Sequence, residues 1–246
     1  RGSALTADQI KAYASAQIRT GLTPVVAHAS YLLNLASPDS GLRKKSVDAL
    51  ADEHDRCGRL GVDFLVLHPG AHLDGTPTAG IKNIARGLDA VHRRAKDNAC
   101  MILLETTAGQ GTALGYRLEQ LGAILDRVKE REVFGVCLDT CHLFAAGYDF
   151  RKEDGYQSMI EALNDAVGVT SVKCIHANDS KRECGSRVDR HEHIGKGKIG
   201  KSGFRHFVND PHWSGLPFIL ETPKGKDGRG TDLDKVNLRR LRSLLA

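Results

Sequence analysis

Six apolar, strand-like runs of this chain each end in a residue that can bind a metal ion or move a proton. The six end residues are His28, His68, Glu105, Asp139, His176 and Glu221. Packing several imidazoles and carboxylates together without partners costs free energy, and a bound cation offsets that cost. Mixed nitrogen and oxygen donors suit Zn²⁺, Mn²⁺ or Fe²⁺ better than Mg²⁺ or Ca²⁺, which prefer oxygen ligands alone. The pattern therefore predicts a metal centre.

Two further groups extend the set of candidate ligands. His142 follows the strand-end residue Asp139 by three positions. Asp189 and His191 lie two positions apart in the loop after the fifth apolar run. An Asp-x-His pair alone is more often structural. Together with His142, and in a loop that is rich in lysine and arginine, this pair becomes a credible pair of ligands. The spacing by itself leaves His193 open as an alternative to His191.

Other chemistry has weaker support in the sequence. Residues 195–200 match the pattern GxGxxG, but they do not follow directly on a strand within a compact βαβ unit, so a dinucleotide site is not expected. The chain contains no GxSxG pattern. Its six cysteines show no clear Cys/His dyad, so catalysis by a nucleophilic thiol is not favoured.

The cysteines and the apolar runs indicate the setting of the protein. No CxxC pair is present, and Cys100, Cys137 and Cys174 lie within or at the edge of apolar runs. This pattern indicates buried, reduced thiols, so we expect a cytoplasmic protein, or a nuclear one if the source is eukaryotic. No apolar run approaches the ~18 residues that a membrane helix needs, and no membrane contact is expected.

The net charge of +5 is concentrated in one segment. Between Lys173 and Arg205 the chain has nine lysines and arginines but four acidic residues, so this segment accounts for the whole excess. A solvated charged loop would be the default interpretation. Next to a predicted metal centre, the segment favours an anionic partner such as nucleic acid or a phosphorylated substrate.

Strands and helices are expected to alternate along the chain. The expected strands are Pro24–His28, Phe64–His68, Met101–Glu105, Val133–Asp139, Val172–His176 and Pro217–Glu221. Apolar stripes with helical spacing run from Ile81 to Ala95 and from Leu118 to Val128, and Thr231–Leu245 is expected as a last amphipathic helix. Nearly all-apolar strands between helices predict a parallel sheet covered by helices.

The spacing of the strand ends favours a barrel. Successive end residues are 34 to 45 positions apart, which is the size of a βα unit. In a (β/α) barrel the six end residues converge at the carboxyl-terminal mouth, whereas an open doubly wound sheet would spread them along an edge. We therefore expect a TIM (β/α)8-type barrel, with residues 1–246 forming a single domain.

Several motifs together resemble endonuclease IV, the zinc-dependent apurinic/apyrimidinic endonuclease family of base excision repair. The motifs occur in the family's order as His28-Ala-Ser-Tyr31-Leu32, Leu67-His68-Pro69-Gly70, Leu104-Glu105-Thr106, Leu138-Asp139-Thr-Cys-His142, His176-Ala-Asn178-Asp179, Arg187-Val-Asp189-Arg190-His191 and Leu220-Glu221-Thr222. The resemblance runs from about residue 5 to the end of the chain. It implies a metal-dependent DNA-repair hydrolase that acts on duplex DNA.

The resemblance also implies three zinc ions and a ligand set for each. The first zinc would be bound by His28, His68 and Glu105. The second would share Glu105 and be completed by Asp139, His176 and Glu221. The third would be bound by His142, Asp189 and His191. Only the resemblance selects His191 over His193.

The implied reaction is hydrolysis of the phosphodiester on the 5′ side of an abasic site, leaving a 3′-hydroxyl and a 5′-deoxyribose phosphate. A pair of metal ions can lower the pKa of a water and neutralise the phosphate oxygens. The catalytic candidates are Glu105, which would set the metal spacing, and Glu221, which would orient or deprotonate the attacking water.

The resemblance implies how DNA would be bound. Tyr31 and Leu32 would push into the duplex and hold the abasic nucleotide extruded, although a packed loop aromatic is the alternative interpretation of Tyr31. The residues expected near phosphates are Lys181, Arg187, Arg190, Lys196 and Lys198. A monomer is expected, with Mn²⁺ or Fe²⁺ as substitutes for Zn²⁺.

Two alternatives stay open at this stage. One is a divalent-metal sugar isomerase or epimerase on a similar barrel, which would need fewer metals and no basic loop. The other is a catalytically silent protein that binds abasic DNA. Eight βα units of this size need about 310 residues, so 246 residues with six visible strands predict an N-terminally incomplete barrel.

Overall fold

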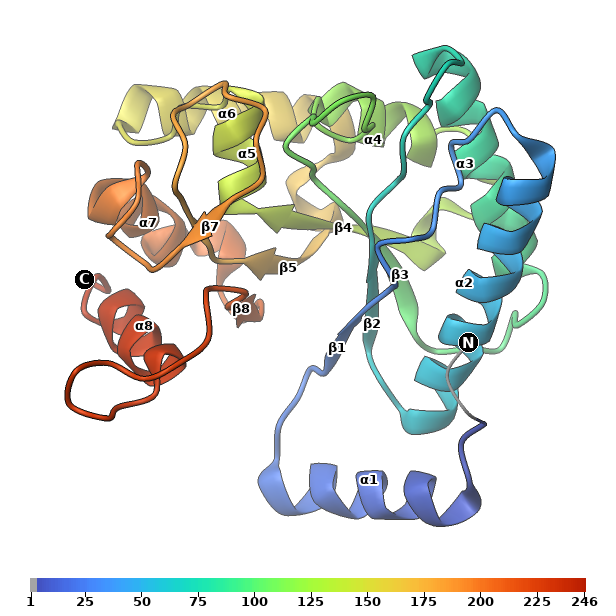
Figure 1. Ribbon diagram of the computed structural model, residues 1–246, viewed down its shortest axis with the longest axis horizontal. Coiled ribbons are helices and arrows are strands. Elements are labelled where there is room, and N and C mark those ends of the chain that lie inside the picture. Colours follow the sequence, from blue (N-terminus) through green and yellow to red (C-terminus); the bar gives the residue numbers. More distant parts are fainter. Residues whose placement is uncertain (1–3) are drawn as a thin grey trace. The chain divides into compact units, whose positions relative to one another are not determined.

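The computed structural model describes residues 4–246, which divide into two compact units. The first unit comprises the chain up to Glu105 together with Ala123–Gly135, and the second comprises Thr106–Gly122 and Val136–Ala246. Each unit contains helices and parallel strands (Figure 1). No helix in the described part of the chain is long and apolar enough to cross a membrane. The single domain expected from the sequence stays a prediction.

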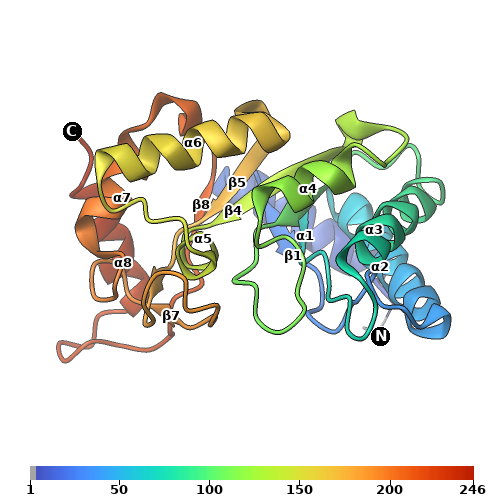
Figure 2. The same ribbon diagram turned by 90° about the horizontal axis from the view of Figure 1, so that it is seen from above.

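The first unit alternates helices with strands. Its elements up to Glu105 are α1 (Ala7–Thr20), β1 (Val26–His28), α2 (Ser40–Leu60), β2 (Phe64–Leu67), α3 (Pro77–His92) and β3 (Met101–Glu105). The helix α1 begins with a capping box between Thr6 and Gln9, and Asp39 caps α2 by accepting the N–H of Leu42. The helices α2 and α3 pack side by side (Figures 1 and 2).

Parallel pairing in the order β1-β2-β3 fixes the first three strand ends. His28 pairs with Val66, and Phe64 pairs with Met101. His68 follows directly on β2, and Glu105 is the last residue of β3. Because all three strands run in the same direction, these side chains meet at one edge of the sheet.

The remaining elements follow Glu105 along the chain, and most of them belong to the second unit. They are α4 (Leu118–Leu125), η1 (Arg131–Val133), β4 (Phe134–Asp139), α5 (Thr140–Ala146), α6 (Glu153–Val167), η2 (Val169–Ser171), β5 (Val172–His176), β6 (Asp179–Ser180), β7 (His191–Glu192), α7 (Gly200–Asn209), η3 (Pro211–Trp213), β8 (Phe218–Ile219) and α8 (Leu233–Arg242). The parallel order is β4-β5-β8, with Asp139 opposite His176 and His176 opposite Ile219.

All six expected strands are present, and two end earlier than the sequence suggested: β2 ends at Leu67, one residue before His68, and the sixth strand ends two residues early. The sixth run was expected to continue to Glu221, but β8 ends at Ile219. The N–H of Glu221 donates to the side-chain oxygen of Asn178 at 2.8 Å instead of to a strand carbonyl. Glu221 therefore lies on the loop after the strand.

The expected apolar stripes are buried except at Ala95, which lies after the end of α3 and is half-buried, and one small sheet was not foreseen. Ile84 and Leu88 of α3 and Leu121 and Ile124 of α4 are buried. The strands β6 and β7 pair antiparallel at the base of the basic loop, and two-residue strands have no periodicity that a sequence could reveal.

Candidate metal centre

The first group of candidate ligands lies at the carboxyl ends of β1, β2 and β3. Oε2 of Glu105 is 2.8 Å from Nε2 of His28 and 3.0 Å from Nε2 of His68. Glu105 is buried, whereas the two imidazoles are partly open to solvent. Two imidazole nitrogens and one carboxylate oxygen in this arrangement can bind one metal ion.

The hydrogen bonding of His28 shows why a cation fits there. Nδ1 of His28 lies 2.8 Å from the carbonyl oxygen of Ala29 and can only donate to it. Nε2 of the neutral ring then carries a lone pair that faces the lone pairs of Glu105. Two acceptors at 2.8 Å need a proton or a cation between them. The backbone carbonyl thus orients the ring in the way that metal-binding histidines are commonly oriented.

A second group repeats this arrangement in the other unit. Oδ2 of Asp189 lies 3.2 Å from Nε2 of His142. The other carboxylate oxygen, Oδ1, lies 3.1 Å from Nε2 of His191. Nδ1 of His142 faces the carbonyl oxygen of Thr106 at 2.8 Å, and Nδ1 of His191 faces that of Glu221 at 3.3 Å. Nε2 of His191 is buried without a well-directed hydrogen bond among the described residues. A cation among these three side chains would satisfy that nitrogen.

The charges in this group perturb each other. Burial by itself would raise the pKa of Asp189, but the nearby imidazoles of His142 and His191 outweigh burial and hold this pKa below its usual range. Burial by itself would lower the pKa of His191, but Asp189 and Asp139 raise it to about 9. Without a metal, a proton on the imidazole of His191 therefore offsets the negative charge of the carboxylates. A bound cation would take the place of that proton.

Asp139, His176 and Glu221 form a third set. Each offers one ligand atom within 4.8 Å of the others. Nδ1 of His176 lies 3.2 Å from Oε2 of Glu221. Asp139 and His176 are buried, while the Glu221 side chain is 34% exposed and open to a substrate or water. The bridging role of Glu105, which belongs to the other unit, stays a prediction.

Asn178, for which the sequence motifs predicted no role, lies at the centre of this set. Its buried side-chain amide donates to Oδ2 of Asp139 at 2.6 Å, and its Oδ1 accepts the N–H of Glu221 at 2.8 Å. The backbone N–H of Asn178 donates in turn to Oγ1 of Thr140 at 2.9 Å. Asn178 thus positions two candidate ligands at once. The sequence could have pointed to Asn178 through its position two residues after the candidate ligand His176.

The glycine-rich run 195–200 has a structural role in this fold. The buried carboxylate of Asp179 accepts the N–H groups of Gly197 and Ile199, both at 3.0 Å. A Cβ on Gly197 would come within 2.3 Å of the carbonyl oxygen of Ser180, so the close approach needs glycine. These N–H groups are used to fold the basic loop against Asp179.

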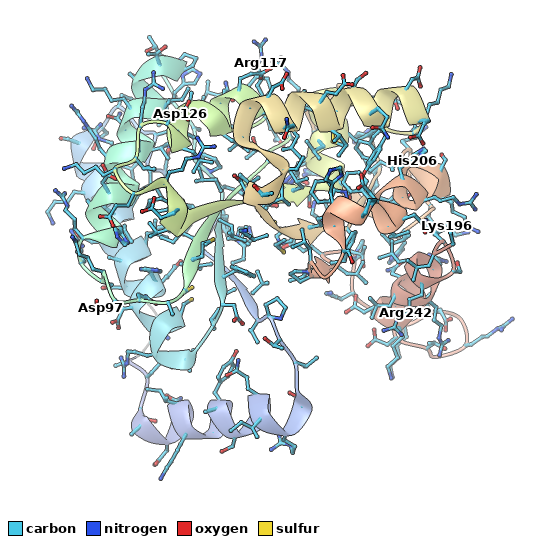
Figure 3. All side chains as sticks on the ribbon, turned by 180° about the vertical axis from the view of Figure 1, so that it is seen from behind. Asp97, Arg117, Asp126, Lys196, His206 and Arg242 are labelled. Carbon is cyan, nitrogen blue, oxygen red and sulfur yellow. The ribbon has the colours of Figure 1, made fainter. Side chains whose placement is uncertain are left out.

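The predicted phosphate-binding residues are all exposed: Lys181, Arg187, Arg190, Lys196 and Lys198. Lys196 projects from the surface of the second unit (Figure 3). The guanidinium of Arg187 lies 4.8 Å from the ring centre of Tyr116, and Lys198 pairs with Glu183 at 2.6 Å. Both contacts hold long side chains on the loop without burying their charge.

Tyr31 and Leu32 are exposed on the loop after β1. Their exposed fractions are 84% and 70%, and they are adjacent in sequence. The alternative interpretation of Tyr31 as a packed loop aromatic is wrong, because so little of the ring is covered. Two neighbouring large apolar side chains in water cost free energy unless a partner covers them.

Two other residues weighed in the sequence have different surroundings. Nδ1 of His193 lies 3.0 Å from the side-chain amide of Asn237, and His193 belongs to none of the candidate ligand groups of the described residues. Cys141 is buried, and burial raises the pKa of its thiol to about 12. A thiol with such a pKa is a poor nucleophile near neutral pH.

Comparisons with known proteins define the class of the fold and then the family. Residues 1–244 match the family model of the xylose isomerase-like TIM barrel. The chain is 49% identical over 241 residues to "Probable endonuclease 4" of Chloroflexus aurantiacus, covering 98% of this chain and 84% of the relative. It is also similar to the crystal structure of endonuclease IV from Thermus thermophilus, with a TM-score of 0.84, 37% identity, and coverage of 99% of this chain and 84% of the other.

The chain thus has the xylose isomerase-like TIM-barrel fold. Within that class it belongs to the endonuclease IV family, a family of DNA-repair nucleases. A D-tagatose 3-epimerase-like protein also matches, with a TM-score of 0.75 but only 21% identity, over 97% of this chain and 83% of that one. At this identity the match shows the fold alone, so it gives no support to the sugar-epimerase alternative.

Proposed function

We propose that this chain hydrolyses the phosphodiester on the 5′ side of abasic sites in duplex DNA with three zinc ions, leaving a 3′-hydroxyl and a 5′-deoxyribose phosphate. One observation carries the proposal: His28, His142 and His191 each turn Nδ1 to a backbone carbonyl and Nε2 to a carboxylate. Rings oriented in this way are prepared for metal binding, and nuclease relatives at 49% identity favour phosphodiester hydrolysis over other metal chemistry.

The nine candidate ligands divide among the three ions. His28, His68 and Glu105 would bind one, with Glu105 also reaching a second that is completed by Asp139, His176 and Glu221. His142, Asp189 and His191 would bind the third. When bound, the ions neutralise the phosphate oxygens and the departing 3′-oxygen, and they acidify a water.

Glu221 is our candidate for the group that accepts the proton of the attacking water. Its carboxylate is the most exposed in the Asp139–His176–Glu221 set, so a water can reach it. Asn178 and His176 fix the loop and the carboxylate from two sides. A carboxylate held in this way can orient a water before it takes the proton.

DNA would be bound by the basic loop and by the two exposed apolar residues. The loop supplies an excess of five positive charges between Lys173 and Arg205, which attracts phosphates irrespective of sequence. Tyr31 and Leu32 would enter the duplex at the lesion, where a missing base leaves a gap that an apolar wedge can fill. Selectivity for abasic sites follows from this gap.

The decisive experiment uses duplex DNA with a single abasic-site analogue. We expect incision on the 5′ side that stops when a chelator removes the metal and returns when Zn²⁺ is added, with Mn²⁺ or Fe²⁺ as substitutes. Metal analysis should give three zinc ions per chain, and gel filtration should give a monomer. Absence of chelator-sensitive incision together with a zinc content well below three would refute the proposal. Conversion of a ketose sugar in place of incision would favour the epimerase.

A further inference from the structure

Two buried thiols lie one layer below the metal ligands of β4 and β5. Cys137 pairs with Cys174 across the two strands, and Asp139 pairs with His176 in the same register. Residues two apart on a strand point to the same face, so each thiol shares a face with the ligand on its own strand. The rise per residue puts the thiol pair about 6.5 Å from the ligand pair along the strands.

The thiols and the imidazole are close enough to bind one ion. The sulfurs of Cys137 and Cys174 and one ring nitrogen of His176 all lie within 4.8 Å of one another. All three residues are buried. His176 also belongs to the set with Asp139 and Glu221, so it is shared by two groups of donors.

The chemistry of the two groups differs. The set with Asp139 and Glu221 has carboxylate oxygens and suits a borderline cation such as Zn²⁺. A pair of thiolates with one imidazole suits soft cations, because sulfur is a polarisable donor. Binding releases the two thiol protons, which leaves the ion with two thiolate charges in a site closed to water.

We propose that Cys137, Cys174 and His176 form a binding site for a soft, thiophilic cation, and that an ion bound there withdraws His176 from the catalytic centre. The second half of this proposal rests on the proposed nuclease function, and the first half does not. Soft cations would therefore inhibit the enzyme through two residues that take no part in the reaction.

Cadmium is a suitable probe, because its bonds to thiolate sulfur absorb in the ultraviolet and its bonds to oxygen and nitrogen do not. Cys57 and Cys100 share a side-chain hydrogen bond and are a second pair of neighbouring thiols. The titration is therefore done with the reduced, chelator-treated C100A chain, in which that second pair is broken. We expect a thiolate–cadmium band that saturates at one ion per chain.

The matched comparison is between C100A/C174A and C100A/C184A. Both remove one further thiol, but only the first touches the proposed site. The band should disappear in C100A/C174A and persist in C100A/C184A, with circular dichroism confirming that both are folded. C100A/C137A provides a second variant in case the first does not fold. A missing band in C100A, or a band that persists without Cys174, would overturn the proposed site.

Inhibition tests the shared histidine separately. Cadmium should inhibit incision of abasic DNA by the zinc-loaded C100A chain, and C174A in that background should raise the inhibitory concentration at least about tenfold. Equal inhibition of C100A and C100A/C174A would overturn the proposal that the bound ion withdraws His176. If the protein does not incise abasic DNA at all, the proposed function fails, and the absorption titration still decides whether the site exists.

Discussion

The side-chain amide of Asn178 joins Asp139 to the Glu221 loop. It donates to Oδ2 of Asp139 at 2.6 Å while its oxygen accepts the N–H of Glu221 at 2.8 Å. Neither contact is between neighbours in sequence, so one buried residue holds together candidate ligands from two separate segments. A change at Asn178 should therefore disturb both ligands at once.

Asn178→Ala should weaken metal binding without removing a ligand. Asp139 loses its donor and the Glu221 loop loses its anchor, and changes of this kind typically cost about 10–100-fold in metal affinity. Competition with a zinc chelator measures the effect. Asn237→Ala is the matched control, because Asn237 is also buried and hydrogen-bonded but contacts Thr222 and His193. Equal zinc affinity in both variants would contradict the positioning role.

Glu221→Gln should abolish incision while the protein stays folded. The amide keeps the size of the side chain but cannot accept a proton from water, and it is a weaker metal ligand. Single-turnover cleavage of abasic DNA measures the loss, and thermal unfolding reports on folding. Glu183→Gln, which changes an exposed acid paired with Lys198, serves as the control. A full cleavage rate in Glu221→Gln would show that another group takes the proton.

Tyr31→Ala and Leu32→Ala should weaken binding to abasic DNA with little change in stability. Both side chains are exposed, so the fold loses no packing, whereas a stacked or inserted side chain contributes about 1–3 kcal/mol, or about 5- to 150-fold in affinity. Fluorescence anisotropy with abasic and intact duplexes measures the difference. Ile18→Ala removes another exposed apolar side chain, from α1, and should leave both affinities unchanged. A similar loss on intact DNA would argue against insertion at the lesion.

Lys196→Ala should reduce the salt dependence of DNA binding. Each phosphate contact contributes about 0.9 to the slope of log affinity against log salt concentration, so losing one contact should lower the slope by about that amount. Arg242→Ala is the control, since Arg242 is exposed on α8 outside the basic segment (Figure 3). An unchanged slope for Lys196→Ala would place the DNA elsewhere on the surface.

His54 should make the protein less stable in mild acid. It is buried, Nε2 donates to the carbonyl oxygen of Cys100 at 2.8 Å, and Nδ1 has no hydrogen-bond partner in the described part of the chain. Burial lowers the pKa of His54, so the unfolded chain takes up its proton first as the pH falls. The free energy of unfolding therefore decreases below about pH 6.5, by at most about 1.4 kcal/mol per pH unit from this group.

The measurement compares urea unfolding of the wild type and His54→Gln at about pH 7.5 and pH 5. The variant should lose less stability between the two pH values than the wild type. His212→Gln is the control, because His212 is exposed and pairs with Asp210. An identical pH response in the wild type and His54→Gln would show that the burial of His54 does not matter in this range.

The strand ends were within reach of the sequence. Each apolar run had a composition typical of a covered parallel strand, and the residue at its end was chemically distinct from the run itself. Glu221 was placed less well, because strand pairing stops at Ile219 and the contact with Asn178 holds the next residues of the chain. The choice of His191 over His193 needed the family resemblance. Both histidines lie in the same loop, two residues apart, and the spacing of the candidate ligands does not distinguish between them.

The sequence by itself determined the order of strands and helices, the types of candidate ligand and the location of the positive charge, because these depend on local periodicity and residue chemistry. The tertiary structure decided what depends on distance between remote segments. It oriented the imidazoles of His142 and His191 through backbone carbonyls from remote parts of the chain. It placed Asn178 between Asp139 and Glu221, and it folded the glycine-rich run onto the carboxylate of Asp179. It also placed Cys137 and Cys174 beside His176, a relation that only the register of two parallel strands creates.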